Sequence, residues 1–412
     1  MIRWIFVIIV ILLIEFYAFQ AIRTLTKNSV IQVFHVVVTT VILCYVIYTF
    51  ASYDRSVGPT KYTLRATALF LLSFVPKLVL LLCMFGEDVV RVGVLGYTYV
   101  TDTFFDRQQS VTFPERRKFI SQLALGIAAI PFVGLLDGIF RGKYNFKVLT
   151  HTLYFNDLPD AFEGFRLTQI SDIHSGSFDE TEKIEYAIDL INEQESDILF
   201  FTGDIVNTTA SEMDDWIGVF KKIKSYPYGK HSILGNHDYG EYVTWDTPEE
   251  KEANFEAIKG IHDKIDFNLL LNDCTFIEKN GERLAIIGVE NWGHNFKKAG
   301  DLEKASRQVN DEDFKILLSH DPSHWEHEVK DDQKHYHLTL SGHTHGFQFG
   351  IEIPGFLKWS PVQYVYKHWA GLYKEAGQYL HVNRGFGFHA YPGRVGIWPE
   401  ITVLELRKTK VS

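Results

Sequence analysis

Long, nearly uninterrupted apolar runs occupy the first third of the chain. Three of them, Trp4–Gln20, Val30–Ala51 and Ala66–Phe85, have about the length at which a helix crosses ~30 Å of hydrocarbon. A fourth run, Phe119–Phe140, is richer in Gly and Ala. Buried helices of a soluble core are the alternative, but so many long apolar runs in close succession are uncommon in soluble folds. The pattern predicts an all-α transmembrane region of about four spans over residues 1–143.

After residue 143 the pattern changes to short strand-like runs that alternate with amphipathic helices. Apolar residues recur at helical spacing over Thr181–Gln194, and Glu212–Lys222 and Pro248–Lys264 are further predicted helices. The predicted strands include Tyr144–Tyr154, Arg166–Ile170, Ile198–Thr202, Leu284–Glu290, Phe314–Ser319, Leu338–Gly342, Tyr379–Asn383 and Ile401–Leu406. This alternation predicts an α/β domain over residues 144–412, in which two packed sheets are flanked by helices.

Five short polar blocks stand at the ends of apolar runs, where strands deliver loop residues into a common cleft. They are rich in His, Asp and Asn and contain no thiol, a donor set that suits Mn, Fe or Zn better than a structural zinc site built from Cys. Any one block alone would be an ordinary turn or helix cap, but together they predict a site for two divalent metal ions. The blocks are Asp172-Ile173-His174, Gly203-Asp204, Gly235-Asn236-His237-Asp238, Ser319-His320-Asp321 and Gly342-His343-Thr344-His345.

Such a site suits the hydrolysis of phosphate esters. Two cations about 3.5–4 Å apart share a bridging carboxylate, activate water and neutralise the phosphoryl oxygens. Asn236 would supply an amide oxygen that adds no negative charge opposite an anionic substrate. The sequence shows neither a Ser/His/Asp nucleophile arrangement nor a P-loop glycine run, so neither a covalent serine mechanism nor nucleotide-driven phosphoryl transfer is expected.

The order and local form of the blocks resemble the calcineurin-like metallophosphoesterase superfamily over residues 146–412, in its membrane-bound bacterial type. The resemblance implies a four-layer αββα sandwich and a metal-dependent hydrolase that cleaves a phosphodiester, phosphomonoester or pyrophosphate bond. It implies that Asp172, His174 and His345 hold one metal ion, that Asn236, His320 and His343 hold the second, and that Asp204 bridges the two. His237 would be the catalytic histidine that assists the transition state or the leaving group.

Two positions depart from the superfamily pattern. Asn207 stands where many relatives carry a second Asp, and Phe347 stands where membrane-associated relatives often have Gly. Neither is an expected ligand, so the departures bear on the choice of substrate.

Membrane-associated relatives suggest a lipid-linked pyrophosphate as substrate, such as UDP-2,3-diacylglucosamine, and hence a role in lipid metabolism. A broad phosphoesterase acting on soluble substrates is the alternative within enzymes. A non-catalytic metal-binding scaffold or receptor is the alternative outside them. A transporter is not expected, since the apolar runs show no sign of paired broken helices or repeats.

Charge divides the chain in the same place as hydropathy. Residues 1–145 carry 14 Lys and Arg against 8 Asp and Glu, whereas the remainder carries 27 against 43. A domain this acidic is a poor partner for nucleic acid, so the metals would have to attract an anionic substrate locally. Cys274 is the one cysteine after residue 145, which excludes a disulfide framework within that part. The sequence does not predict an oligomeric state.

Basic residues give conflicting predictions of the side of the membrane on which the α/β domain lies. Arg116-Arg117-Lys118 precedes the fourth run and, if cytoplasmic, places the α/β domain outside. Basic residues of the second loop and after the fourth run favour the opposite orientation. They are Arg55, Lys61, Arg65, Arg141, Lys143 and Lys147. We favour an integral multi-pass protein of the inner cell membrane with an extracytoplasmic catalytic domain, although a nucleotide-linked lipid would lie in the cytoplasm.

Further polar and aromatic residues leave alternatives open. Glu15, His35 and Lys77 are costly in lipid; Glu15 and Lys77 could pair, or each could reach water near a span end. The aromatic segment Phe347–Tyr373 could admit an acyl chain, lie at the bilayer interface or pack on its own domain. Arg384 and Arg394 could grip a phosphate, but structural pairing is the default expectation.

Overall fold

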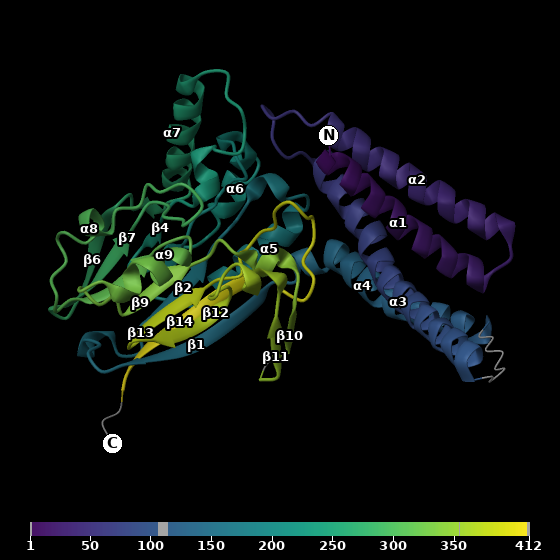
Figure 1. Cartoon of the computed structure of the whole chain (residues 1–412). Helices are drawn as coiled ribbons and strands as arrows, with labels where there is room; N and C mark the ends of the chain where they lie inside the picture. Colours follow the sequence, from purple (N-terminus) through teal and green to yellow (C-terminus); the bar gives the residue numbers. More distant parts are fainter. Residues whose placement is uncertain (1, 106–113, 354, 410–412) are drawn as a thin grey trace. The chain divides into compact units, whose positions relative to one another are not determined.

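The computed structural model describes residues 2–105, 114–353 and 355–409, and it divides into two compact units (Figure 1). The helical unit comprises Met1–Tyr53 and Tyr62–Asp137. The α/β unit comprises Gly138–Ser412 together with the short segment Asp54–Lys61, which lies between two helices of the helical unit in sequence.

The helical unit consists of α1 (Ile2–Leu25), α2 (Ser29–Ala51), α3 (Lys61–Phe105) and α4 (Pro114–Phe140). Among the described residues, α2, α3 and α4 are long and apolar enough to cross a membrane, which confirms the membrane region. The span predicted over Trp4–Gln20 lies within α1 and stays a prediction. Helix α3 has 45 residues and so extends well beyond the predicted run. Charged residues end the apolar run at Glu87, but they are good helix formers and do not end the helix.

An ion pair between buried Lys77 and partly buried Glu15 holds α1 and α3 together. Lys77 Nζ lies 2.7 Å from Glu15 Oε1 and also donates to Ser73 Oγ at 2.9 Å and Thr39 Oγ1 at 3.2 Å. The predicted pairing of Glu15 with Lys77 is therefore present. Because a lone charge is costly in lipid, the pair and its two hydroxyl partners face the interior of the bundle.

The α/β unit contains two six-stranded sheets. The first has the order β1 (Lys147–Phe155), β14 (Glu400–Lys408), β2 (Arg166–Ile170), β3 (Ile198–Phe201), β4 (Lys230–Ser232) and β5 (Asn268–Leu269). The second has the order β12 (Gly371–Glu375), β13 (Gln378–Val382), β9 (Leu338–Ser341), β8 (Phe314–Leu318), β7 (Glu282–Gly288) and β6 (Asp273–Lys279). The runs β2–β5 and β7–β8–β9–β13 are parallel, so the carboxyl ends of the strands within each run share one edge of their sheet.

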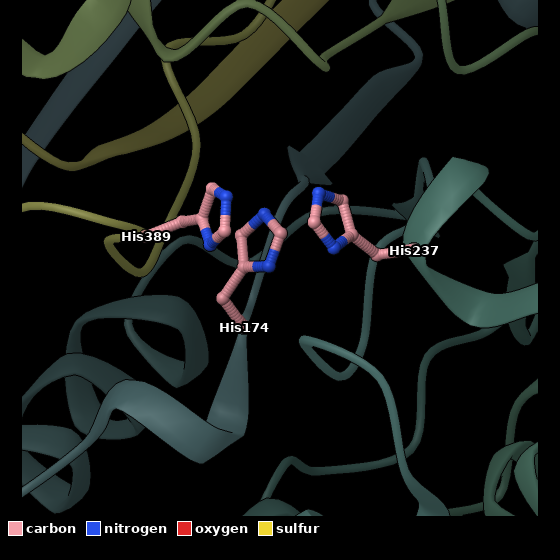
Figure 2. Close-up of side chains that lie close together, drawn as sticks. All are labelled: His174, His237 and His389. Atoms are coloured by element: carbon pink, nitrogen blue, oxygen red, sulfur yellow. The ribbon is translucent and has the colours of Figure 1, made fainter. Parts of the chain in front are cut away.

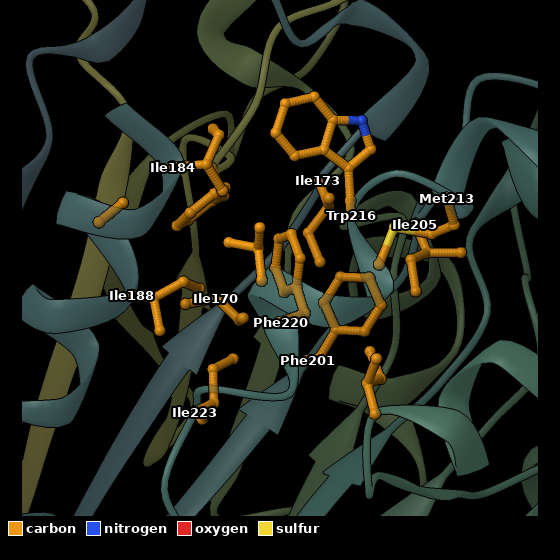
Figure 3. Close-up of a cluster of buried hydrophobic side chains, with 14 of the residues drawn as sticks. Ile170, Ile173, Ile184, Ile188, Phe201, Ile205, Met213, Trp216, Phe220 and Ile223 are labelled. Atoms are coloured by element: carbon orange, nitrogen blue, oxygen red, sulfur yellow. The ribbon is translucent and has the colours of Figure 1, made fainter. Parts of the chain in front are cut away.

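Both faces of the central strands of each sheet are buried, which explains the continuous apolar runs of these strands. In β3, Ile198 and Phe200 pack between the two sheets, while Leu199 and Phe201 pack on the outer face beneath helices. That outer core is covered by α5 (Thr181–Asn192), α6 (Ile217–Phe220) and α7 (Pro248–Lys264). Figure 3 shows part of it, including Ile184 of α5 and Phe220 of α6. Helices α8 (Leu302–Ala305) and α9 (Ser323–His327) cover the second sheet. The result is the expected four-layer αββα sandwich.

The predicted helices α5 and α7 are present, but only Ile217–Phe220 of the helix predicted over Glu212–Lys222 is α-helical. A 3-10 turn occupies Ala210–Met213, and α6 is only four residues long. The Glu212 carboxylate turns back to accept the backbone N–H groups of Asn207 and Thr209, which caps a turn at the point where the pattern suggested a longer helix. The first predicted strand begins at Lys147, because Lys143 and Tyr144 are held in a 3-10 turn by the Asp179 carboxylate.

Candidate dinuclear metal centre

The five polar blocks meet at the carboxyl ends of strands from both sheets. Asp172 and His174 follow β2, Asp204 follows β3, and Asn236 and His237 follow β4. His320 follows β8, and His343 and His345 follow β9. The expected ligands are all buried, except His343, which is partly exposed.

The side chains form two groups joined by one carboxylate. In the first group, His345 Nε2 lies 3.0 Å from His174 Nε2 and 3.2 Å from Asp172 Oδ1. In the second, His343 Nδ1 lies 2.7 Å from Asn236 Oδ1 and 3.3 Å from His320 Nε2.

Asp204 lies between the two groups. Its Oδ2 is 3.1 Å from His320 Nε2 in the second group and 3.6 Å from His174 Nε2 in the first. A single carboxylate therefore faces nitrogen donors of both groups, which is the geometry that a bridging ligand requires.

Backbone and hydroxyl groups outside the two clusters orient the rings. His320 Nδ1 lies 2.7 Å from the carbonyl oxygen of Thr202, so Nδ1 carries the proton and Nε2 is free to face the site. His343 uses Nδ1 toward the site, and its Nε2 lies 2.8 Å from the Tyr366 hydroxyl. Partners of this kind fix which nitrogen of a histidine can bind a metal.

The Asp238 side chain connects the loops that follow β3 and β4. Its carboxylate accepts the backbone N–H groups of Asp204 and Ile205, each at 2.9 Å, and that of Gly235 at 2.8 Å. Burial and the neighbouring Asp204 charge raise the pKa of Asp238 to about 7. One side chain thus links the loops that follow β3 and β4.

The loops store backbone strain at the site. Five of the expected ligands have positive φ: Asp172 (53°), His174 (49°), Asp204 (60°), His343 (71°) and His345 (49°). Non-glycine residues adopt this conformation rarely and at a cost, and they do so chiefly where function requires it. The neighbouring Gly342 and Gly235 leave no room for a Cβ beside Asp172 and Asp204.

The electrostatics fit a cation-binding site. Burial opposes ionisation of Asp204, yet His320 and His237 outweigh it and hold the pKa of Asp204 well below its ordinary value. Burial also acts to lower the pKa of His320, but Asp204 and Asp172 raise it to about 10. A divalent ion supplies the positive charge that the buried Asp204 carboxylate requires. It also accepts the lone pairs of imidazole nitrogens that face each other, as those of His174 and His345 do at 3.0 Å.

A third histidine group adjoins the first cluster. His174, His237 and His389 offer ring nitrogens within 4.8 Å of one another, and their rings converge from three separate loops (Figure 2). The His389 ring stacks on His174 at 5.0 Å between centroids and meets His237 edge-on at 4.6 Å. Sequence reasoning missed His389, although Gly387-Phe388-His389 follows β13 much as the other blocks follow their strands.

Neither arginine considered for phosphate binding is available. Arg384 is buried and makes ion pairs with Glu352 and Glu400. Arg394 has no exposed surface; it donates to the carbonyl oxygens of Gly385 and Gly387 and to His345 Nδ1 at 3.1 Å. Burial lowers the pKa of Arg394 to about 9. Both side chains hold the loop behind the site together.

A cavity of about 170 Å³ lies next to the second cluster. Tyr366, whose hydroxyl contacts His343, forms part of its wall. The remaining wall is mostly polar, with His294, Asn295, Ser323, Glu326, His327, Lys367 and His368. This cavity therefore adjoins the candidate metal centre through Tyr366 and His343.

Known families match both parts of the chain. Residues 2–143 match a family model described as a probable calcineurin-like phosphoesterase transmembrane domain, and residues 165–347 match the calcineurin-like phosphoesterase model. An uncharacterized metallophosphoesterase, YkuE of Bacillus subtilis, is 30% identical over 262 residues, which cover 63% of this chain and 85% of that protein.

Two further relatives carry informative names. A zebrafish (Danio rerio) transmembrane protein with metallophosphoesterase domain is 27% identical over 300 residues, 69% of this chain and 62% of that protein. The phosphodiesterase YaeI of Escherichia coli is 26% identical over 300 residues, 71% of this chain and 98% of that protein. The chain therefore belongs to the calcineurin-like phosphoesterases, and it is a metal-dependent hydrolase with a transmembrane region.

Proposed function

We propose that the α/β unit is a dinuclear phosphoesterase that hydrolyses a phosphodiester, phosphomonoester or pyrophosphate bond. Asp172, His174 and His345 would hold one divalent ion, and Asn236, His320 and His343 the other. The observation that carries the proposal is the placement of Asp204 Oδ2 between His320 and His174, at 3.1 and 3.6 Å. When bound, Mn, Fe or Zn ions would activate water and neutralise the charge on phosphorus-bound oxygens.

The chain's own residues supply the remaining chemistry. His237 Nδ1 donates to the carbonyl oxygen of Asn207 at 2.7 Å, which directs Nε2 toward the cluster that His237 forms with His174 and His389. Burial lowers the pKa of His237, so Nε2 of the neutral ring is a proton acceptor. Once Nε2 is protonated, the ring can donate a hydrogen bond to a phosphoryl oxygen or a proton to the departing oxygen. Tyr242 stacks on His237 at 4.3 Å between centroids and limits the ring's movement.

Substitution of Asp204 by Asn tests the dinuclear centre. The full-length protein, purified in detergent and loaded with Mn, is expected to hydrolyse bis-p-nitrophenyl phosphate. Asp204→Asn should lose nearly all of this activity, whereas Asp189→Asn on the exposed face of α5 should retain it. Unchanged hydrolysis by Asp204→Asn would overturn the proposal.

We further propose that the substrate is lipid-linked and that the α/β unit lies outside the cytoplasm. The support is the membrane region joined directly to the hydrolase, together with the basic cluster at the start of α4. The comparison of UDP-2,3-diacylglucosamine with UDP-N-acetylglucosamine isolates the contribution of the acyl chains. At least tenfold higher kcat/KM for the acylated compound is expected, and equal values would favour a soluble substrate.

A reporter fused after Ser412 tests the orientation. An alkaline phosphatase fusion is expected to be active and a green fluorescent protein fusion dark. The opposite pair of results would place the unit in the cytoplasm, where a nucleotide-linked lipid precursor becomes the favoured substrate.

A further inference from the structure

A small β-hairpin follows the last metal-binding block and stands apart from both sheets. Its strands are β10 (Ile351–Ile353) and β11 (Leu357–Trp359), which pair only with each other among the described residues. The hairpin extends beyond the body of the sheets (Figure 1). The sequence pattern predicted no strand within the aromatic segment Phe347–Tyr373, so the hairpin is a feature that only the fold reveals.

The hairpin has one polar and one apolar face. The antiparallel register places Glu352 opposite Lys358, and Ile353 opposite Leu357 on the other face. The polar pair is used to fasten the hairpin to its own domain. Glu352 makes a two-pronged ion pair with Arg384, at 2.6 and 3.0 Å. Lys358 donates to the carbonyl oxygen of Ala370 and lies over the Trp369 ring.

The apolar face is left outward, which is the reverse of the usual arrangement for a protein in water. Ile351 and Ile353 are each 48% exposed and Leu357 is 40% exposed. Phe356, at the turn, is 83% exposed. Aliphatic and aromatic groups concentrated on a protruding tip match the interfacial zone of a lipid bilayer.

The base of the hairpin adjoins the point where the chain enters the α/β unit from α4. Gly138 O accepts the backbone N–H of Arg394 at 3.1 Å, and Val395 N–H donates to Gln348 O at 2.8 Å. Gly350 N–H in turn donates to Val395 O at 2.9 Å, one residue before β10. This ladder links the loop before β10 to Gly138, the residue at which the α/β unit continues from α4, a candidate membrane span.

A second connection to the membrane helices contacts a loop near the site. The segment Asp54–Lys61, which joins α2 to α3, belongs to the α/β unit. The carbonyl oxygen of Arg55 accepts the backbone N–H of Thr244 at 2.8 Å. Thr244 lies two residues after Tyr242, whose ring stacks on that of His237. Two membrane connections thus contact loops that carry the site, as does the hairpin.

We propose that the tip of the β10–β11 hairpin inserts its apolar face into the interfacial zone of the membrane that the chain's own helices cross. The occupant of this face is the bilayer, and not a second copy of the chain or a soluble protein. The depth of such an insertion is about 5–10 Å, at the boundary between headgroups and acyl chains. The hairpin would hold the entrance to the metal centre at a fixed height over the lipid surface.

Spin labels measure this insertion without reference to catalysis. The full-length chain, with Cys44, Cys83 and Cys274 replaced by Ser, carries one label through Phe356→Cys, or through Tyr186→Cys on exposed α5 as the matched control. Each is reconstituted in phosphatidylcholine vesicles, and a thermal melt verifies the fold. Collision with oxygen should exceed collision with a nickel chelate at Phe356→Cys, with the reverse at Tyr186→Cys.

The same labels in amphipol separate lipid contact from protein contact. The preference for oxygen at Phe356→Cys is expected to vanish when no bilayer is present. Equal collision rates with the nickel chelate at Phe356→Cys and Tyr186→Cys would overturn the proposal that the hairpin inserts into the membrane. A label shielded in amphipol as in vesicles would also overturn it, in favour of a contact with protein. Absence of hydrolysis in the parent chain would leave these readings intact and count against the proposed function alone.

Discussion

His237 Nδ1 lies 2.7 Å from the backbone carbonyl oxygen of Asn207, and this contact fixes which ring nitrogen faces the metal centre. A carbonyl oxygen can only accept, so Nδ1 must carry a proton. Asn207, which stands where many relatives carry a second Asp, thus contacts His237 through its main chain, and its side chain donates to Ser177. The departure at Asn207 therefore leaves the orientation of the expected catalytic histidine intact.

Loss of the His237 ring should lower turnover without emptying the metal site. His237→Asn is expected to reduce kcat for a phosphodiester by about 10²- to 10⁴-fold, the usual contribution of a placed proton donor. Metal content by elemental analysis should stay at the wild-type level. The exposed His335→Asn is the control. A fall in bound metal equal to the fall in kcat would show that His237 is a ligand.

The two clusters predict separable metal sites. Wild type should retain two ions per chain after gel filtration, and His320→Ala should retain one, because it removes a nitrogen donor from the second cluster only. A ligand present at a thousand times its Kd stabilises the folded state by about 4 kcal/mol, so chelation should lower the melting temperature and Mn should restore it. Two ions retained in His320→Ala would contradict the assignment.

Glu400 should make stability depend on acid pH. Burial acts to raise the pKa of this carboxyl, but Arg384, at 2.5 Å, and His381 outweigh burial and hold its pKa well below the ordinary value. A depressed folded pKa gives stability that is full above the unfolded pKa, near 4.5, and is lost as the pH falls below it.

Thermal melts of Glu400→Gln test this dependence. Removal of one partner from a buried pair costs about 3–5 kcal/mol, so the variant should melt well below wild type at pH 7. The gap should narrow as the pH falls from 5 to 3, whereas exposed Glu182→Gln should match wild type throughout. A gap that does not change with pH would mean that Glu400 stabilises by packing and not by charge.

The buried pair of the helical unit predicts a non-additive double variant. Glu15→Gln and Lys77→Met should each lower the melting temperature in detergent, because each leaves the other charge unpaired in an apolar bundle. The double variant should recover much of the loss. Additive losses would show that the two side chains act independently, despite the 2.7 Å between Lys77 Nζ and Glu15 Oε1.

The residues of the candidate site could be proposed from the sequence, and the packed sheets with flanking helices could be predicted from it. Strands buried on both faces, such as β3 with Ile198 and Phe200, appear as continuous apolar runs, and the polar blocks stand directly after them. The membrane helices follow from length and hydropathy alone. These features depend on neighbours along the chain, so they are visible without the fold.

Only the tertiary structure decided which polar groups partner one another. Sequence spacing could not show that Arg384 is used by Glu352 and Glu400, that His389 joins His174 and His237, or that the hairpin turns Ile351 and Leu357 outward. The local pattern also predicted one helix over Glu212–Lys222, where the structure has a 3-10 turn at Ala210–Met213 and the short helix α6. The partners of Arg384 and the grouping of His389 with His174 and His237 depend on contacts between loops that are distant in sequence, and local patterns carry no record of such contacts.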